Sequence, residues 1–117
     1  MVTMGVNDYI LLIFAPILVL AGLAGFIIPE RKSLTSGARS YNVFHIVFGM
    51  VGIAIVCFAL DTSAVRWFNA GFGIIDLYQA AASRMNWFPV EYFKWKQADD
   101  VLHIIIGLLL VIVGLLV

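Results

Sequence analysis

Two histidines are the residues of this sequence best suited to hold a cofactor or to move a proton. They are the only two in the chain, and each stands in the same short pattern. An amide or carboxylate residue precedes the histidine by three positions, and a glycine follows it by four. The two copies are Asn42-Val-Phe-His45-Ile-Val-Phe-Gly49 and Asp100-Val-Leu-His103-Ile-Ile-Ile-Gly107. The histidines are 103 − 45 = 58 residues apart in a chain of 117, so the sequence predicts two halves of similar build.

The histidine pattern has two interpretations. Imidazoles on neighbouring helices are axial ligands in membrane cytochromes, so His45 and His103 are candidates to bind haem b or chlorophyll. Gly49 and Gly107 would then leave room for the ring. In the alternative, no cofactor is bound, and each histidine lies in the first turns of its helix, bonded to a cap, a carbonyl or interfacial water.

Asp76 is the other residue that needs an explanation, because it falls inside an apolar segment. A charge at the centre of a membrane helix costs roughly 2.5–3.5 kcal/mol, so the carboxyl must be neutral or paired. A proton or ion pathway is one interpretation. The other is a hydrogen bond that fixes helix packing, with Asn69, Tyr9, His45 or His103 as the partner.

The remaining residues do not suggest catalysis. No serine or cysteine nucleophile accompanies a base at a plausible depth, and the Asp99-Asp100 pair is explained by capping of a helix N-terminus. Two histidines are too few to predict a metal site. We therefore expect a protein that is not an enzyme and holds no metal.

The composition is that of a membrane protein. Hydrophobic residues make up 63% of the chain, charged residues make up 12%, and the mean hydropathy is +1.05. Soluble domains are roughly half apolar and a quarter charged. The formal net charge of zero gives no reason to expect a nucleic-acid partner, so we expect the lipid bilayer to be the main environment.

The apolar runs predict an all-α fold, a four-transmembrane-helix bundle built from two similar two-helix halves, in a single domain of residues 1–117. A span needs about 20 apolar residues to cross a core of ~30 Å. The third span is the least apolar, and its polar and small residues recur at intervals of three and four, which predicts a stripe facing the bundle interior. The predicted spans are residues 9–28, 40–60, 64–85 and 100–117. The predicted stripe comprises Asn69, Gly73, Asp76, Ala80 and Ser83.

Residues 86–96 mix aromatic side chains with lysines, which is typical of a segment in the headgroup layer. Trp87, Tyr92 and Trp95 are its candidate interfacial anchors. We expect a short interfacial helix starting at Pro89, and a docking surface for a partner protein is the rival use.

The basic residues predict the orientation. Five of the seven Lys and Arg fall in two loops, residues 29–39 and 86–99, and Arg84 lies just before the second; the two loops are on the same side of a four-span protein. The positive-inside rule makes these loops cytoplasmic and puts both termini on the opposite face. The second and fourth spans then run parallel, with their histidines about equally deep. We expect a multi-pass protein of a bacterial inner or thylakoid-type membrane.

Three elements together carry a family resemblance: Phe44-His45-x-x-x-Gly49, Phe72-Gly73 followed by Tyr78, and Ala98-Asp99-Asp100-Val101-Leu102-His103-x-x-x-Gly107. The chain from residue 41 to residue 117 resembles a bacterial domain-of-unknown-function family of small four-helix integral membrane proteins. The resemblance implies the four-helix fold and no known activity.

These observations predict a non-catalytic accessory or structural subunit of a larger bacterial membrane complex, respiratory or photosynthetic. Self-association through the glycine-lined helix faces is an equally simple arrangement. The haem- or chlorophyll-binding protein and the ion pathway centred on Asp76 remain as alternatives.

Overall fold

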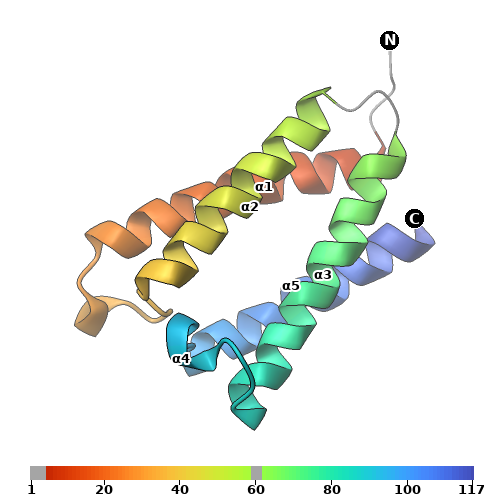
Figure 1. Cartoon of the computed structure of the whole chain (residues 1–117). Helices are drawn as coiled ribbons and strands as arrows, with labels where there is room; N and C mark the ends of the chain where they lie inside the picture. Colours follow the sequence, from red (N-terminus) through yellow and green to blue (C-terminus); the bar gives the residue numbers. More distant parts are fainter. Residues whose placement is uncertain (1–4, 59–61) are drawn as a thin grey trace.

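The computed structural model describes residues 5–58 and 62–117, and every regular element in these ranges is helical. Four helices are long, and two short helical segments lie in the connections between them (Figure 1). The long helices are α1 (Val6–Ile27), α2 (Arg39–Phe58), α3 (Thr62–Met85) and α5 (Gln97–Leu116), and the short ones are η1 (Glu30–Lys32) and α4 (Val90–Phe93). The prediction of an all-helical protein is confirmed.

Two helices start three residues earlier than predicted, and the reason is the same in both. The Asp8 carboxylate accepts a hydrogen bond from the Gly5 backbone N–H at 2.8 Å, and the Asp99 carboxylate accepts one from the Lys96 N–H at 2.8 Å. An acidic residue at the third helical position can thus satisfy an N–H ahead of its helix. The predicted end of the second span at residues 59–60 and the turn residue Asp61 lie outside the described residues.

The long helices form two hairpins. α1 packs along α2 and α3 packs along α5, whereas contacts between the hairpins are sparser (Figure 1). Glycines allow the close approach within each hairpin: a Cβ on Gly73 would lie 2.8 Å from the Gly107 carbonyl oxygen, and one on Gly22 would lie 2.6 Å from the Asn42 carbonyl oxygen. Since small residues let helix backbones touch, these contacts explain the pairing. The equivalence of the two halves stays a prediction.

An aromatic core joins the two hairpins. Phe72 of α3 is 3% exposed and packs with Leu18 and Leu110. The Phe14 ring meets the Phe72 ring edge-on, with 5.6 Å between the centroids, and Phe44 stacks on Phe72 from α2. The predicted stripe on α3 faces this interior: four of its five residues are buried, and Ser83 is half-buried.

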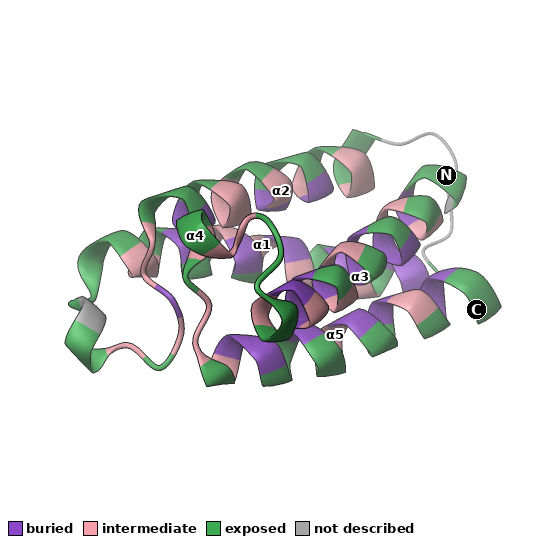
Figure 2. Cartoon of the chain, turned by 60° about the horizontal axis from the view of Figure 1, so that its bottom comes forward, coloured by how far each residue is buried: buried purple, intermediate pink, exposed green. Residues whose placement is uncertain are grey.

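The outer faces of the helices are exposed (Figure 2), and many of the side chains on them are apolar. Exposed aliphatic side chains run along α1 and α5, among them Ile13, Leu20, Ile105 and Ile112. α1, α2 and α5 are each long and apolar enough to cross a membrane. The predicted membrane character is therefore confirmed for three helices. α3 is not among the three.

The two ends of the molecule differ. α1 begins and α5 ends at one end, where the Arg66 side chain donates to the carbonyls of Gly114 at 2.6 Å and Leu115 at 3.1 Å. η1 and α4 lie at the other end, the loop end of the molecule, beside the first turns of α2 and α5 (Figure 1). The short helix expected after Pro89 is confirmed as α4, which begins one residue later.

Candidate functional site

The two histidines line one cavity. α2 begins at Arg39 and α5 at Gln97, so His45 and His103 each lie six residues into their helices (45 − 39 = 6 and 103 − 97 = 6). Both helices begin at the end of the molecule that carries α4, which puts the imidazoles at a similar depth. Asp76 of α3 lines the same cavity, so the three candidate residues of the sequence come together.

The cavity has a volume of about 230 Å³. Its polar lining is concentrated in side chains from three helices and the loop after α1, and the rest of its wall is apolar. The polar residues are Thr35, Ser36, Tyr41, His45, Asp76, Asp99 and His103, and the apolar ones are Phe14, Ile17, Leu18, Ala21, Leu102 and Ile106.

The mouth of the cavity lies between α1 and α5. Of the lining residues, Ile17 (54% exposed) and Leu102 (45% exposed) reach the molecular surface, as does Ala21. These residues stand on helices that are apolar enough to cross a membrane. The cavity therefore opens to the side of the bundle, on the apolar face formed by α1 and α5.

Tyr41 connects α2 to α5 at the wall of the cavity. Its side chain is 2% exposed, and its hydroxyl donates to Asp99 Oδ1 at 3.0 Å and lies 2.8 Å from His103 Nε2. A tyrosine hydroxyl has one proton to donate and lone pairs that accept, so a single hydroxyl can bond both residues at once.

The other ring nitrogen of His103, Nδ1, is buried and makes no hydrogen bond within the described residues, and the whole residue is 5% exposed. Buried polar atoms are usually paired, because an unpaired one costs about 1–3 kcal/mol. His45 likewise shows no hydrogen bond in the described part of the chain, and its ring lies 4.1 Å from that of Tyr41, centroid to centroid. The cavity thus offers acceptor capacity that the described residues do not use.

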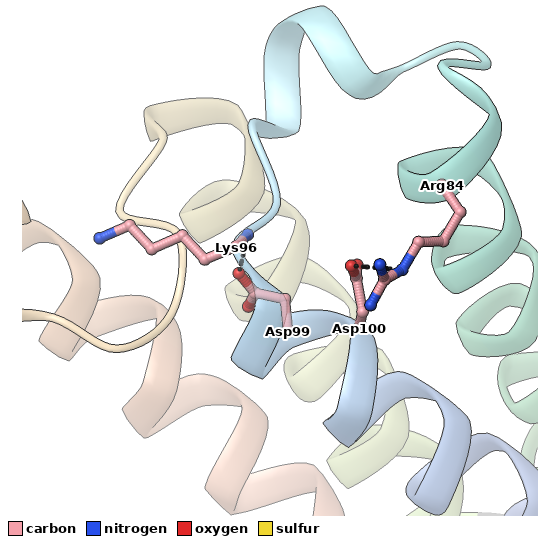
Figure 3. A network of polar contacts seen from close by, with 4 residues as sticks. All are labelled: Arg84, Lys96, Asp99 and Asp100. Carbon is pink, nitrogen blue, oxygen red and sulfur yellow. Dashed lines mark hydrogen bonds and ion pairs between the residues drawn. The ribbon is translucent and has the colours of Figure 1, made fainter.

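Asp99 joins three segments of the chain at the edge of the cavity. Besides the Tyr41 hydroxyl and the Lys96 N–H, its carboxylate accepts the backbone N–H of Ser36 at 2.7 Å, which fastens the loop after α1 to the start of α5. Figure 3 shows the Asp99 carboxylate turned toward the Lys96 backbone, while the neighbouring Asp100 is turned toward Arg84, with 3.4 Å between Oδ2 and Nε. The expected capping role of this acidic pair is confirmed for Asp99, which also holds three segments together.

Asp76 is held by a chain of two hydrogen bonds that leads to Trp95, in the segment between α4 and α5. Its Oδ1 accepts a hydrogen bond from the Gln79 side-chain amide at 3.3 Å, and the Gln79 oxygen accepts one from Trp95 Nε1 at 3.1 Å. The hydrogen-bond partner expected for Asp76 was Asn69, Tyr9, His45 or His103, and this expectation is wrong. The partner is Gln79, one turn further along α3, because that amide lies on the same buried face of the helix.

Gly49 and Gly107 do not leave room for a ring. A Cβ on Gly49 would lie 2.8 Å from the Ala15 carbonyl oxygen of α1, and one on Gly107 would lie 2.9 Å from the Gly73 carbonyl oxygen of α3. The expected role of these glycines is therefore wrong. In each histidine pattern the final glycine allows a long helix to pack closely, α1 against Gly49 and α3 against Gly107.

The haem or chlorophyll prediction has no support in this geometry. His103 Nε2 is engaged by the Tyr41 hydroxyl, so this nitrogen is not open to a metal ion. Within residues 5–58 and 62–117, no three His, Cys, Asp or Glu side chains are placed to hold a metal ion together. Axial ligation by the two histidines stays a prediction.

A continuous polar path from end to end is not present in the described residues. Asn69 donates to the Asn7 side chain at 3.1 Å near the far end of the bundle, and Asp76 lies near the cavity. Phe72 stands between them on the same helix and belongs to the aromatic core, which separates the two polar groups with apolar rings. The ion-pathway prediction gains no support from this arrangement.

The interfacial candidates divide into two kinds. Trp87 and Tyr92 are 48% and 57% exposed, as an anchor in the headgroup layer requires. Trp95 is half-buried, donates to Gln79, and lies edge-on to His103, with 6.5 Å between the ring centroids. Trp95 therefore covers the site from the loop side.

Sequence reasoning missed Tyr41 and Gln79 and gave Asp99 only a capping role. One signal was available: Tyr41 lies four residues before His45, on the same helix face. Gln79 similarly follows Asp76 by three. The pairing of Tyr41 with Asp99, 58 residues away, had no signal in the local pattern.

Comparison with family models, with curated proteins and with solved structures finds no match to this chain. The resemblance to small four-helix bacterial membrane proteins therefore stays a prediction, and the site must be interpreted from its own chemistry.

Proposed function

We propose that this chain is a non-catalytic integral membrane protein that binds a small molecule from the lipid phase. The observation that carries the proposal is the cavity whose mouth, between α1 and α5, leads to five buried or half-buried side chains, those of Tyr41, His45, Asp76, Asp99 and His103. Concave, mostly apolar sites with a few convergent polar groups are typical of ligand binding.

In this proposal all four long helices cross the bilayer. α3 has 24 residues, about 36 Å at 1.5 Å per residue, which exceeds a hydrocarbon core of ~30 Å. Its polar residues Asn69, Asp76 and Gln79 are buried within the bundle, whereas Trp67 and Ile74 are exposed. Polar groups in membrane helices ordinarily face the bundle interior, and this distribution supports a fourth span.

The proposed orientation keeps both loops on the cytoplasmic side of a bacterial inner or thylakoid-type membrane. It is supported by the clustering of Arg31, Lys32, Lys94 and Lys96 at the end that carries η1 and α4. The cavity then lies in the cytoplasmic half of the bilayer.

The test uses a variant that closes the mouth. Ala21→Trp places a large ring on an exposed cavity-lining position, and Leu20→Trp is the matched control, since Leu20 is 63% exposed and does not line the cavity. Each protein is extracted gently from its native membrane and examined by native mass spectrometry. We expect a bound small molecule in the parent and in Leu20→Trp, and its loss in Ala21→Trp. Equal occupancy in all three, or none in the parent, would refute the proposal.

A role as an accessory subunit of a larger bacterial membrane complex is the second candidate. The observation in its favour is the exposed aromatic group of Trp87, Phe88 and Tyr92 at the loop end, which can dock a partner protein or anchor in headgroups. Mild detergent extraction should then bring the chain out with larger polypeptides. Migration as a lone monomer would count against this role, and migration as a homo-oligomer would indicate self-association.

A further inference from the structure

A second hollow continues the cavity along the seam between α1 and α5. It has a volume of about 190 Å³ and shares Phe14, Ile17 and Ile106 with the cavity. Its other lining residues are Ile10, Ile13, Leu109 and Leu110, and all of them are aliphatic. From Ile17 to Ile10 the groove follows α1 for seven residues, roughly 10 Å. It is long and narrow enough for one alkyl chain.

The polar end of this groove holds two carboxyl groups and no basic side chain in the described part of the chain: Asp76 and Asp99 line the cavity, and no Lys or Arg does so. The cations nearby are directed elsewhere: Lys96 Nζ donates to the Ser33 carbonyl at 2.9 Å, and Arg84 pairs with Asp100. An anionic head group would therefore lose its hydration in the cavity without gaining a cationic partner.

Asp76 and Asp99 differ in how well they are satisfied. Asp99 accepts three hydrogen bonds, from Ser36, Tyr41 and Lys96. Asp76 is 3% exposed and has one hydrogen bond within the described residues, at 3.3 Å from the neutral amide of Gln79. A buried carboxylate needs a cationic or strongly donating partner, so Asp76 is the group that a ligand would satisfy.

Asp76, His45 and His103 line the same cavity, and each of these side chains has an atom that can accept a hydrogen bond. A primary ammonium group carries three donors and no acceptor, and its charge stabilises the ionised form of the Asp76 carboxyl. A hydroxyl group supplies one donor and no charge.

We infer that the cavity and the adjoining groove bind a single-chain amphiphile with a primary amine head group. The ammonium lies among Asp76, His45 and His103, and the alkyl chain lies along the seam between α1 and α5. This inference rests on the proposed binding function and adds the chemical class of the ligand.

The experiment compares three probes of equal chain length on the full-length protein in phosphatidylcholine nanodiscs: n-decylamine, decan-1-ol and decanoate. We expect decylamine to bind about tenfold more tightly than decanol, as one charge-assisted hydrogen bond accounts for. Decanoate should not bind. Equal affinity for the amine and the alcohol, or absence of amine binding, would overturn the inference.

Two pairs of variants test where the head group and the alkyl chain of the ligand bind. Asp76→Asn, which keeps the shape of the side chain, should weaken decylamine about tenfold and leave decanol unchanged, while the control Asp100→Asn should change neither. Ile13→Trp fills the groove and should weaken decylamine but not butylamine. Leu12→Trp is its control, because Leu12 is 41% exposed and does not line the groove. Unchanged decylamine affinity in Asp76→Asn or in Ile13→Trp would overturn the inference.

The two proposals fail separately. If a natural ligand is lost in Ala21→Trp but decylamine does not bind, the chain binds a small molecule of another class. If Ala21→Trp changes neither the natural occupancy nor decylamine binding, the cavity is not a ligand site and both proposals are wrong.

Discussion

The hydroxyl of Tyr41 lies 2.8 Å from Nε2 of His103 and donates to Asp99 Oδ1, so one side chain of α2 bonds two residues of α5. Together with the hydrogen bonds from the Ser36 N–H to Asp99 and from Lys96 Nζ to the Ser33 carbonyl, this contact joins the two hairpins at the loop end. Tyr41, His103 and Asp99 are at most 5% exposed. The contact therefore fixes two walls of the cavity, α2 and α5, relative to each other.

Removal of the Tyr41 hydroxyl should lower the stability of the protein. Tyr41→Phe leaves His103 Nε2 without its hydrogen-bond partner and Asp99 without one donor, and we expect a loss of about 1–3 kcal/mol in the free energy of unfolding. Tyr9→Phe is the control, because Tyr9 is 54% exposed. Thermal unfolding in detergent measures both, and equal melting temperatures would show that the hydroxyl does not join the hairpins.

Asp99 and Asp100 should respond differently to the same substitution. Asp99→Asn replaces a carboxylate that accepts three hydrogen bonds with a neutral amide, and we expect the free energy of unfolding to fall by roughly 1.5–3 kcal/mol. Asp100→Asn should cost under about 1 kcal/mol, since its partner Arg84 is 66% exposed at the side chain. Hydrogen exchange gives a local reading: the Ser36 amide should exchange faster in Asp99→Asn only. Equal protection of that amide in both variants would contradict the anchoring role.

Glycine substitutions test the pairing of helices. Gly107→Ala places a Cβ 2.9 Å from the Gly73 carbonyl and from Leu77 Cγ, so α5 must move away from α3, at about 1–3 kcal/mol. Gly71→Ala is the matched control, because nothing lies within 4 Å of its Cβ position. It should be neutral or stabilising by up to about 1 kcal/mol. Thermal unfolding measures the stability of the two variants, and equal effects would mean that Gly107 does not allow close packing of α5 on α3.

The orientation can be read from cysteine accessibility. In a Cys57→Ser background, Leu34→Cys marks the loop after α1 and Val117→Cys marks the end of α5, and both positions are exposed. A membrane-impermeant maleimide should label the Val117→Cys protein in intact spheroplasts and the Leu34→Cys protein only after lysis. The reverse pattern would invert the orientation, and labelling of both before lysis would rule out a spanning arrangement with these ends on opposite faces.

The sequence by itself determined the helices, the buried stripe of α3 and the equal depth of the two histidines. These follow from local quantities: the length of an apolar run, the 3.6-residue period, and the side chains that stop or start a helix. The position of His45 relative to the start of α2 is fixed within twenty residues of chain, and so is that of His103 in α5.

Tertiary structure alone decided which helices touch and what the glycines and carboxylates contact. Gly49 and Gly107 could face each other across a ring or pack on the preceding helix, and both choices satisfy the same local pattern. The close contacts of α1 with α2 and of α3 with α5 select the second. Tyr41 and Asp99 meet across 58 residues because the two hairpins dock at the loop end, and the cavity exists only where residues of α1, α2, α3 and α5 come together. Hydrogen bonds and close packing between distant segments depend on distances of a few ångströms, which spacing along one helix does not encode.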